Sequence, residues 1–118
     1  MTLVPQSDLR TIGGISDDEI TAIRNFLQGA VYCWCKNRPD EWFSLRDLMG
    51  GENTRWAGTP LLALYEKHEG SSEDPVLQAG QDGGWLLKRV ISEDLRRFET
   101  REAYRIREYH WLRDGNDE

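Results

Sequence analysis

Apolar residues recur at steps of three and four positions between residues 20 and 34. Ser16 and Glu19 bound a capping-box pattern, and acidic residues fill the first turn behind it, where they face the positive end of a helix dipole. Apolar residues follow at Ile20, Ile23, Leu27, Ala30, Val31 and Trp34. Pro39 disfavours helical backbone at the residue before it. The pattern therefore predicts one amphipathic helix over residues 17–36.

The middle of the chain has two further helix start signals, each followed by a shorter apolar pattern. Ser44 and Asp47 repeat the capping-box pattern with Asp in place of Glu, and they predict a short helix whose apolar face is Leu45, Leu48 and Met49. Thr59 and Pro60 suit an N-cap and a first helical position, and they predict a further helix over about residues 60–69. Residues 70–75 are a loop by composition.

A fourth apolar pattern begins after Gly83 and Gly84. Its helical face is Leu86, Leu87, Val90 and Ile91, and the opposite stripe is Trp85, Lys88, Arg89, Ser92 and Arg96. This is the only predicted helix with a clearly basic exposed face. We expect the first helix to bury Ile23, Leu27, Val31 and Trp34 against Leu45 and Leu48 and against Leu86, Leu87 and Val90.

The last segment, residues 95–112, has two interpretations. As a ribbon, one strand presents Arg96, Phe98 and Thr100 on one face, a second presents Tyr104, Ile106 and Glu108, and the turn lies near Arg101 and Glu102. As a helix, the same segment would have its apolar stripe interrupted by Glu102. Aromatic and β-branched residues favour the ribbon.

The order of these elements resembles a winged helix-turn-helix domain with one inserted helix. The resemblance rests on residues 42–48 as the entrance and second helix, on residues 84–91 as the recognition helix and on residues 104–111 as the returning wing strand. It implies an α+β, mostly α, single domain that ends in a two-stranded wing. It also implies contact with duplex DNA, with the recognition helix in the major groove and the wing on the backbone or in the minor groove.

The length of the chain and the distribution of its charges indicate how the domain is organised. With 118 residues the chain is one domain, which we expect to span residues 16–113, between a flexible N-terminal arm over 1–15 and an acidic tail over 114–118. Residues 1–84 hold 7 Lys and Arg against 13 Asp and Glu, whereas residues 85–113 hold 8 against 5. The apolar stretches are too short for a membrane span, and the N-terminus lacks the pattern of a signal peptide, so we expect a soluble cytoplasmic protein.

The resemblance and the local positive charge assign candidate DNA contacts. The residues expected in or near the groove are Lys88, Arg89 and Arg96. The residues expected to contact phosphates are Arg97, Arg101, Arg105 and Arg107. Trp85 packs either on sugar or in the core, and the core is the stronger option. Three carboxylates argue against DNA binding, since Asp82 lies where the recognition helix is expected to begin and Glu93 and Asp94 follow its basic face.

Enzymatic, cofactor and metal chemistry have little support in the sequence. Cys33 and Cys35 diverge by about 200° on a helix, which disfavours a shared metal or a mutual disulfide. His68 and His110 have no nucleophile nearby in sequence. The glycine-rich stretch 80–84 lacks the lysine and the preceding strand of a phosphate-binding loop. We therefore expect a non-enzymatic protein with no cofactor and no metal.

Two further expectations concern partners. The alternative to DNA binding is a protein-interaction module on the same scaffold, an adaptor or inhibitor whose carboxylates imitate phosphates. A homodimer is expected as well, because two-fold symmetry doubles the contacts of a small DNA-binding domain. The first helix and the apolar residues of the arm are the expected contacts; the latter are Leu3, Val4, Leu9 and Ile12.

Overall fold

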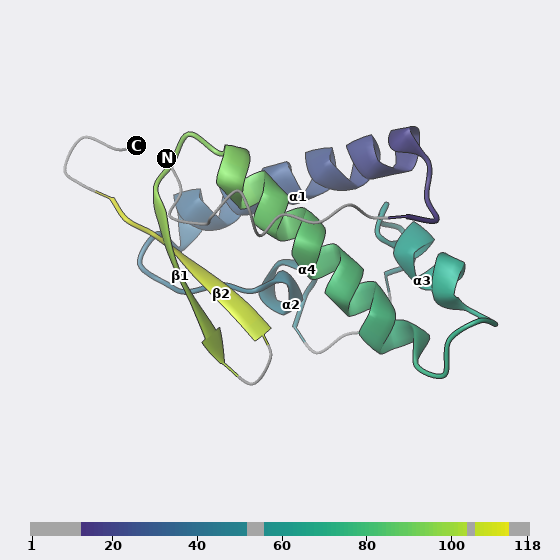
Figure 1. Cartoon of the computed structure of the whole chain (residues 1–118). Coiled ribbons are helices and arrows are strands. Elements are labelled where there is room, and N and C mark those ends of the chain that lie inside the picture. The colour runs from purple at the N-terminus through teal and green to yellow at the C-terminus, as the bar shows by residue number, and fades with distance from the viewer. Residues whose placement is uncertain (1–12, 52–55, 104–105, 114–118) are drawn as a thin grey trace.

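The fold is α+β and mostly helical, with a two-stranded antiparallel sheet at the C-terminal end. A computed structural model describes residues 13–51, 56–103 and 106–113. Its elements are α1 (Asp17–Asn37), α2 (Leu45–Leu48), α3 (Leu62–His68), α4 (Pro75–Glu93), β1 (Phe98–Ala103) and β2 (Ile106–Trp111). The long helices α1 and α4 cross each other, with α3 at one end of the molecule and the ribbon at the other (Figure 1).

The predicted first helix is confirmed with its start signal. The hydroxyl of Ser16 accepts a hydrogen bond from the backbone N–H of Glu19, and the Glu19 carboxylate accepts one from the Ser16 N–H. Arg38 caps the other end by donating its N–H to the Trp34 carbonyl at 2.6 Å. Ile23, Leu27, Val31 and Cys35 form the buried face of α1. Trp34, which was expected to be largely buried, is half-buried, and its indole N–H donates to the carbonyl of Glu41.

The two middle helices are shorter than the long pair and begin in different ways. Ser44 and Asp47 form the predicted capping box, which starts the single turn of α2. For α3 the start lies later than predicted, because Thr59 caps a turn that precedes the helix: its hydroxyl accepts from the Leu61 N–H, and Leu61 is the N-cap of α3.

The C-terminal segment is the ribbon and not the helix. β1 and β2 pair antiparallel from Phe98 opposite Trp111 to Ala103 opposite Ile106. The turn predicted near Arg101 and Glu102 is wrong, since both residues pair within β1 and the strands are joined beyond Ala103. Tyr104 and Arg105 lie outside the described residues.

A single backbone pair attaches the entrance of α2 to the ribbon. Phe43 and Tyr109 exchange two backbone hydrogen bonds, of 2.9 and 2.8 Å. The two side chains are buried, and their rings lie 5.9 Å apart between centroids. The ribbon is therefore fixed to the helical part of the fold and does not depend on its own two strands alone for stability.

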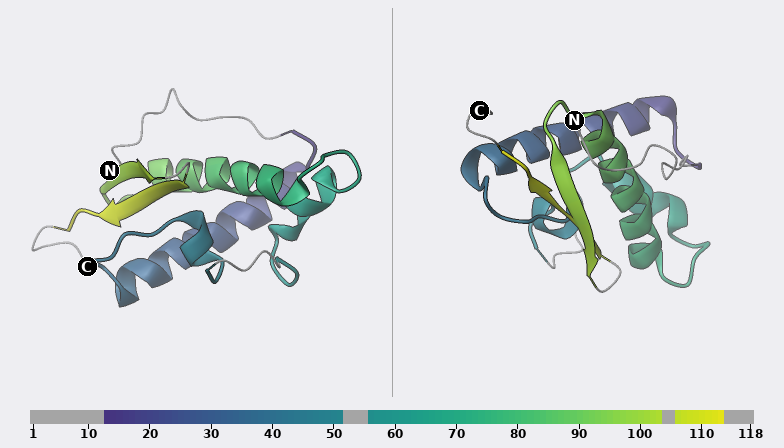
Figure 2. Two further views of the ribbon diagram at one scale, coloured as in Figure 1. Left: turned by 90° about the horizontal axis from the view of Figure 1, so that it is seen from below. Right: turned by 60° about the vertical axis from the view of Figure 1, so that its left-hand side comes forward.

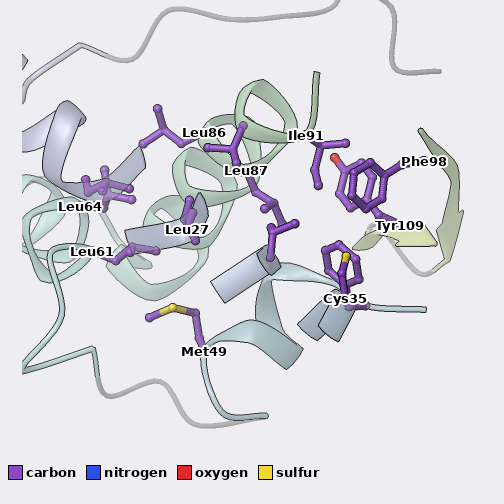
Figure 3. Packing of buried hydrophobic residues seen from close by; sticks show 14 of the residues in the cluster. Leu27, Cys35, Met49, Leu61, Leu64, Leu86, Leu87, Ile91, Phe98 and Tyr109 are labelled. Carbon is purple, nitrogen blue, oxygen red and sulfur yellow. The ribbon is translucent and has the colours of Figure 1, made fainter. Parts of the chain in front are cut away.

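The core fills the space between α1 and α4. Figure 3 shows Leu86, Leu87 and Ile91 of α4 over Leu27 of α1, with α3 on one side and the ribbon aromatics on the other. Leu61, Leu64, Phe98 and Tyr109 are all within 1% of complete burial. Leu45 and Leu48 contribute from α2 as half-buried side chains. The predicted packing of α1 against α2 and α4 is thus present, although the α2 side is more open than expected.

The largest difference from the sequence prediction is the start of α4. The helix was expected to follow Gly84, but it begins at Pro75, where Asp74 caps it by accepting from the Leu77 N–H at 3.1 Å. Gly80, Gly83 and Gly84 are therefore inside a helix of 19 residues. At Gly83 the reason is steric, because an added Cβ would lie 2.7 Å from Cδ2 of Leu45. Glycine at this position allows α2 and α4 to approach closely.

Candidate nucleic-acid interface

The candidate interface has two parts, the solvent face of α4 and the ribbon that follows it. The buried residues of α4 turn toward α1, α2 and α3. The opposite side of the helix carries Leu77, Gln81 and Lys88, of which the first two are exposed and Lys88 is half-buried. Trp85 is half-buried and packs against the core, which agrees with the stronger of its two expected roles. Figure 2 shows that α4 and α1 lie in two stacked layers, so this face of α4 points away from α1.

Asp82 anchors the first half of α4 to α3. Its carboxylate lies 2.7 Å from Nζ of Lys67 and 2.8 Å from Nε2 of His68, and the Asp82 side chain is only 8% exposed. Lys67 also donates to the carbonyl of Gly13, which ties the start of the described chain to the same place. Asp82 is therefore in the middle of a helix and paired inside the fold, and the expectation that it lies at the helix start and opposes a phosphate there is wrong.

Arg89 is held beside α1. Its Nε lies 3.7 Å from a carboxylate oxygen of Glu93, and Glu93 also pairs with Arg24 of α1. The Arg89 Nε atom is buried and has no hydrogen bond with a described residue. Arg89 thus lies at the side of α4 that adjoins α1 and is separated from the face of Gln81 and Lys88.

Arg96 is a structural residue of the connection between α4 and β1. The Nη1 atom of Arg96 donates to both oxygens of the buried Asp94 carboxylate, each at 3.0 Å. The guanidinium lies 5.5 Å from the ring centroid of Tyr32 and equally far from that of Trp111. With 18% of its side chain exposed, Arg96 is the least available of the described arginines predicted to contact DNA.

A thiol lies close to this ion pair. Burial raises the pKa of Cys35 to about 11, an effect that Arg96 opposes and Asp94 reinforces. Cys35 is thus kept as a neutral thiol in the core, whereas Cys33 is exposed. The two cysteines face different surroundings, as their spacing on a helix predicts.

Two arginines of the ribbon are paired across the strands, on opposite faces. On one face, Nε of Arg101 donates to Glu108 at 2.7 Å, and its guanidinium lies 3.9 Å from the ring centroid of Trp42. On the other face, Arg107 donates to Thr100 at 3.1 Å and to Glu102 at 3.2 Å. The Arg101 and Arg107 side chains remain 53% and 36% exposed. Each arginine is therefore held in a fixed direction and still reaches solvent.

The ribbon face of Arg101 also carries an aromatic stack. The rings of Trp42 and His110 are stacked with centroids 5.3 Å apart, and Nδ1 of His110 lies 2.9 Å from a carboxylate oxygen of Glu99. His110 is thus the partner of a carboxylate and an indole at the surface of the sheet. Among the residues that the structure describes, no group of three or more His, Cys, Asp and Glu side chains is arranged to hold a metal ion.

The predicted DNA contacts that the structure describes lie on separate parts of the surface. Lys88 lies on the solvent face of α4, Arg89 beside α1, Arg96 in the connection, and Arg101 and Arg107 on the two faces of the ribbon. Arg97 is exposed next to the start of β1. Arg105 lies outside the described residues, so its place relative to the others stays a prediction.

Two features near these residues were missed in the sequence. Gln81 is exposed on the same face as Lys88, but the glycines around it predict a helix boundary instead of a helix interior. The second is a ladder of alternating cations and rings that runs from α1 to the end of β2. Its members are Lys36, Tyr32, Arg96, Trp111 and Arg113. Only the three-dimensional contacts reveal the ladder, because its members come from three separate segments.

Searches with protein-family models, curated proteins and solved structures gave no match to this chain. None of the helices in the described ranges is long and apolar enough to cross a bilayer.

Proposed function

We propose that this chain binds duplex DNA as a winged-helix protein, with α4 directed at the major groove and the ribbon at the phosphate backbone. The observation that carries the proposal is the attachment of a ribbon with arginines on both faces to the end of a long helix with an exposed side. The element order is the one that the winged-helix resemblance implies, with α3 as the inserted helix. The backbone pair of Phe43 and Tyr109 supports it, because it fixes the ribbon relative to the helices.

The solvent face of α4 carries side chains suited to base edges. Gln81 and Lys88 lie seven residues apart, two helical turns, and so point in nearly the same direction. A glutamine amide can donate to and accept from adenine, and a lysine donates to guanine in the major groove. Sequence preference is therefore assigned to these two residues, and Arg89 is left out of the base contacts because it lies beside Glu93 and α1.

The two-sided ribbon is suited to the minor groove, which has a phosphate strand along each wall. Arg101 and Arg107 extend from opposite faces of the ribbon, so a ribbon inserted edgewise would direct one arginine to each strand. Glu108 and Glu102 hold the two guanidinium groups before binding. A phosphate oxygen then replaces or shares a carboxylate partner, and contacts of this kind fix position without reading sequence.

Variants of the two parts separate their roles. Gln81→Ala with Lys88→Ala is expected to weaken a selected site by more than a random duplex, because the lost contacts are to bases. Arg101→Gln with Arg107→Gln is expected to weaken both duplexes alike and to reduce the slope of log K against log salt by about 2, one for each phosphate contact. Arg38→Gln is the matched control, since Arg38 is exposed, pairs with Glu41 and belongs neither to α4 nor to the ribbon.

The measurement is fluorescence anisotropy of labelled duplexes, selected and random, at several salt concentrations. Equal loss on both duplexes for the α4 pair would remove α4 as the reading helix. A ribbon pair that behaves like Arg38→Gln would remove the ribbon from the interface.

A second function, binding of a basic protein, is favoured by the charge around the start of α4. Exposed carboxylates cluster where α3 connects to α4, and they belong to Glu66, Glu69, Glu73 and Asp74. The formal net charge of the chain is −6, and several arginines are already neutralised by carboxylates. Such a surface attracts a cationic partner and speeds the encounter with it. Failure to bind any duplex at low salt would transfer the proposal to this function.

A further inference from the structure

The outward face of α1 has a regular row of exposed positions. The row consists of Asp18, Ala22, Asn25, Gly29, Tyr32 and Lys36. Its alternating steps of four and three residues keep the row on one face of the helix. The row lies opposite the buried face of Ile23, Leu27 and Val31, and α4 covers the other side of the helix (Figure 2).

The row is complementary to itself when its direction is reversed. In an antiparallel pair of α1 helices related by a two-fold axis between Asn25 and Gly29, each position meets a partner of different character. Asp18 meets Lys36, Ala22 meets Tyr32, and Asn25 meets Gly29, each from the other copy. The first pair joins opposite charges, the second places a small side chain against a large one, and the third places an amide against a glycine. The two-fold symmetry repeats each pair.

Charge decides the direction of such a pair. The first turn of α1 is acidic, with Asp17, Asp18 and Glu19, and its last turn carries Lys36. The 21 residues of α1 place these ends about 30 Å apart, so each end acts separately. A parallel pair would bring like charges together at both ends, whereas an antiparallel pair brings opposite charges together. Among the described residues, none forms an ion pair or hydrogen bond with the Asp18 side chain.

The middle of the row permits close approach. A Cβ added at Gly29 would have nothing within 4 Å, so the surface there is open. Ala22 is the next small position toward the acidic end. Tyr32 is 52% exposed, which is unusual for a large aromatic side chain in this chain, where most others are half-buried or buried. In the antiparallel pair, Ala22 of one copy would leave space for the Tyr32 ring of the other copy, a ring that Lys36 and Arg96 of its own chain also contact.

We propose that a second copy of this chain docks antiparallel on the outward face of α1 and forms a two-fold symmetric dimer. The interface is one helix wide and mostly polar, which places it in the small, reversible class of interfaces with dissociation constants in the micromolar range. The proposal names the contacts for the dimer expected from the sequence. It stands on the pattern of α1 and is independent of DNA binding.

Charge reversal gives a test in which two defective variants complement each other. Asp18→Lys and Lys36→Asp each place like charges together twice in a homodimer, so each variant alone is expected to raise the dissociation constant at least tenfold. In an equimolar mixture the heterodimer restores both attractive pairs, and dimerisation is expected to return. Asp17→Lys is the matched control, because it reverses a charge in the same turn but lies off the row. Gly29→Gln is expected to block the approach without an internal clash.

Sedimentation equilibrium measures the dissociation constants, native mass spectrometry identifies the heterodimer, and circular dichroism checks that each variant is folded. The proposal is overturned if the wild-type chain is a monomer at several hundred micromolar. It is overturned equally if Asp18→Lys or Gly29→Gln dimerises as the wild type does, if Asp17→Lys is as defective as Asp18→Lys, or if the mixture stays monomeric.

Discussion

Replacement of Gly83 by alanine tests the contact between α2 and α4. In an open helix interior this exchange stabilises by about 1 kcal/mol, because glycine loses more conformational freedom on folding. At Gly83 the new Cβ would lie 2.7 Å from Cδ2 of Leu45, 3.5 Å from Leu61 and 3.6 Å from Leu64. Only the first distance is below ordinary contact, and it involves the end of a half-buried leucine. Overpacking of this kind costs about 1–3 kcal/mol, so the gain is cancelled or reversed.

Gly80 and Gly84 are the matched controls in the same helix, since a Cβ at either position has nothing within 4 Å. Gly80→Ala and Gly84→Ala are expected to raise the free energy of unfolding by about 0.5–1 kcal/mol, and Gly83→Ala to fall below them by about 1–3 kcal/mol. Urea unfolding followed by tryptophan fluorescence and circular dichroism gives these values. Equal gains at all three positions would refute the close approach of α2. Losses at both Gly80 and Gly84 would refute a helix that runs through them.

Two further predictions concern the core. Leu27→Ala should lower the free energy of unfolding by about 2–5 kcal/mol in the same assay, because the fully buried side chain leaves a cavity between α1 and α4, and a loss under about 1 kcal/mol would contradict this packing. Cys35 ionises near pH 9.0 in the unfolded chain but has its pKa raised to about 11 by burial, so its contribution to stability is complete below pH 9.0 and is lost as the pH rises to 11. Cys35→Ala should therefore flatten the decline of stability over this interval, and an unchanged slope would contradict the raised pKa. Burial also raises the pKa of Tyr109 from its ordinary value of 10.0, so Tyr109 adds a decline that begins near pH 10.0 and is the same in both proteins.

Local signals in the sequence were sufficient for the two helices that begin with a capping box. Ser16 and Ser44 start α1 and α2 by bonding to residues three positions away, and such contacts are visible in the sequence itself. The ribbon was also chosen correctly over a helix, because its strands concentrate aromatic and β-branched residues. The start of α4 was missed, since the choice of glycine at position 83 depends on Leu45 from a different helix.

The candidate interface was less predictable than the fold. Which arginines are available depends on carboxylates that approach from other segments. Arg96 is held by Asp94 and two aromatic rings, and Arg101 by Glu108, a pairing that requires the register of the ribbon. A count of positive residues in the sequence cannot distinguish such paired arginines from one that is exposed near the start of β1, such as Arg97.

The most direct test of DNA binding is the affinity of the unmodified protein for a random duplex as a function of salt. If Arg101 and Arg107 contact phosphates, the protein binds at low salt and its affinity falls as salt is raised. The slope of log K against log salt is then expected to be about −2 or steeper, since each phosphate contact contributes about −0.9. An affinity that does not change with salt, or no binding at the lowest salt concentration, would contradict the proposed DNA interface.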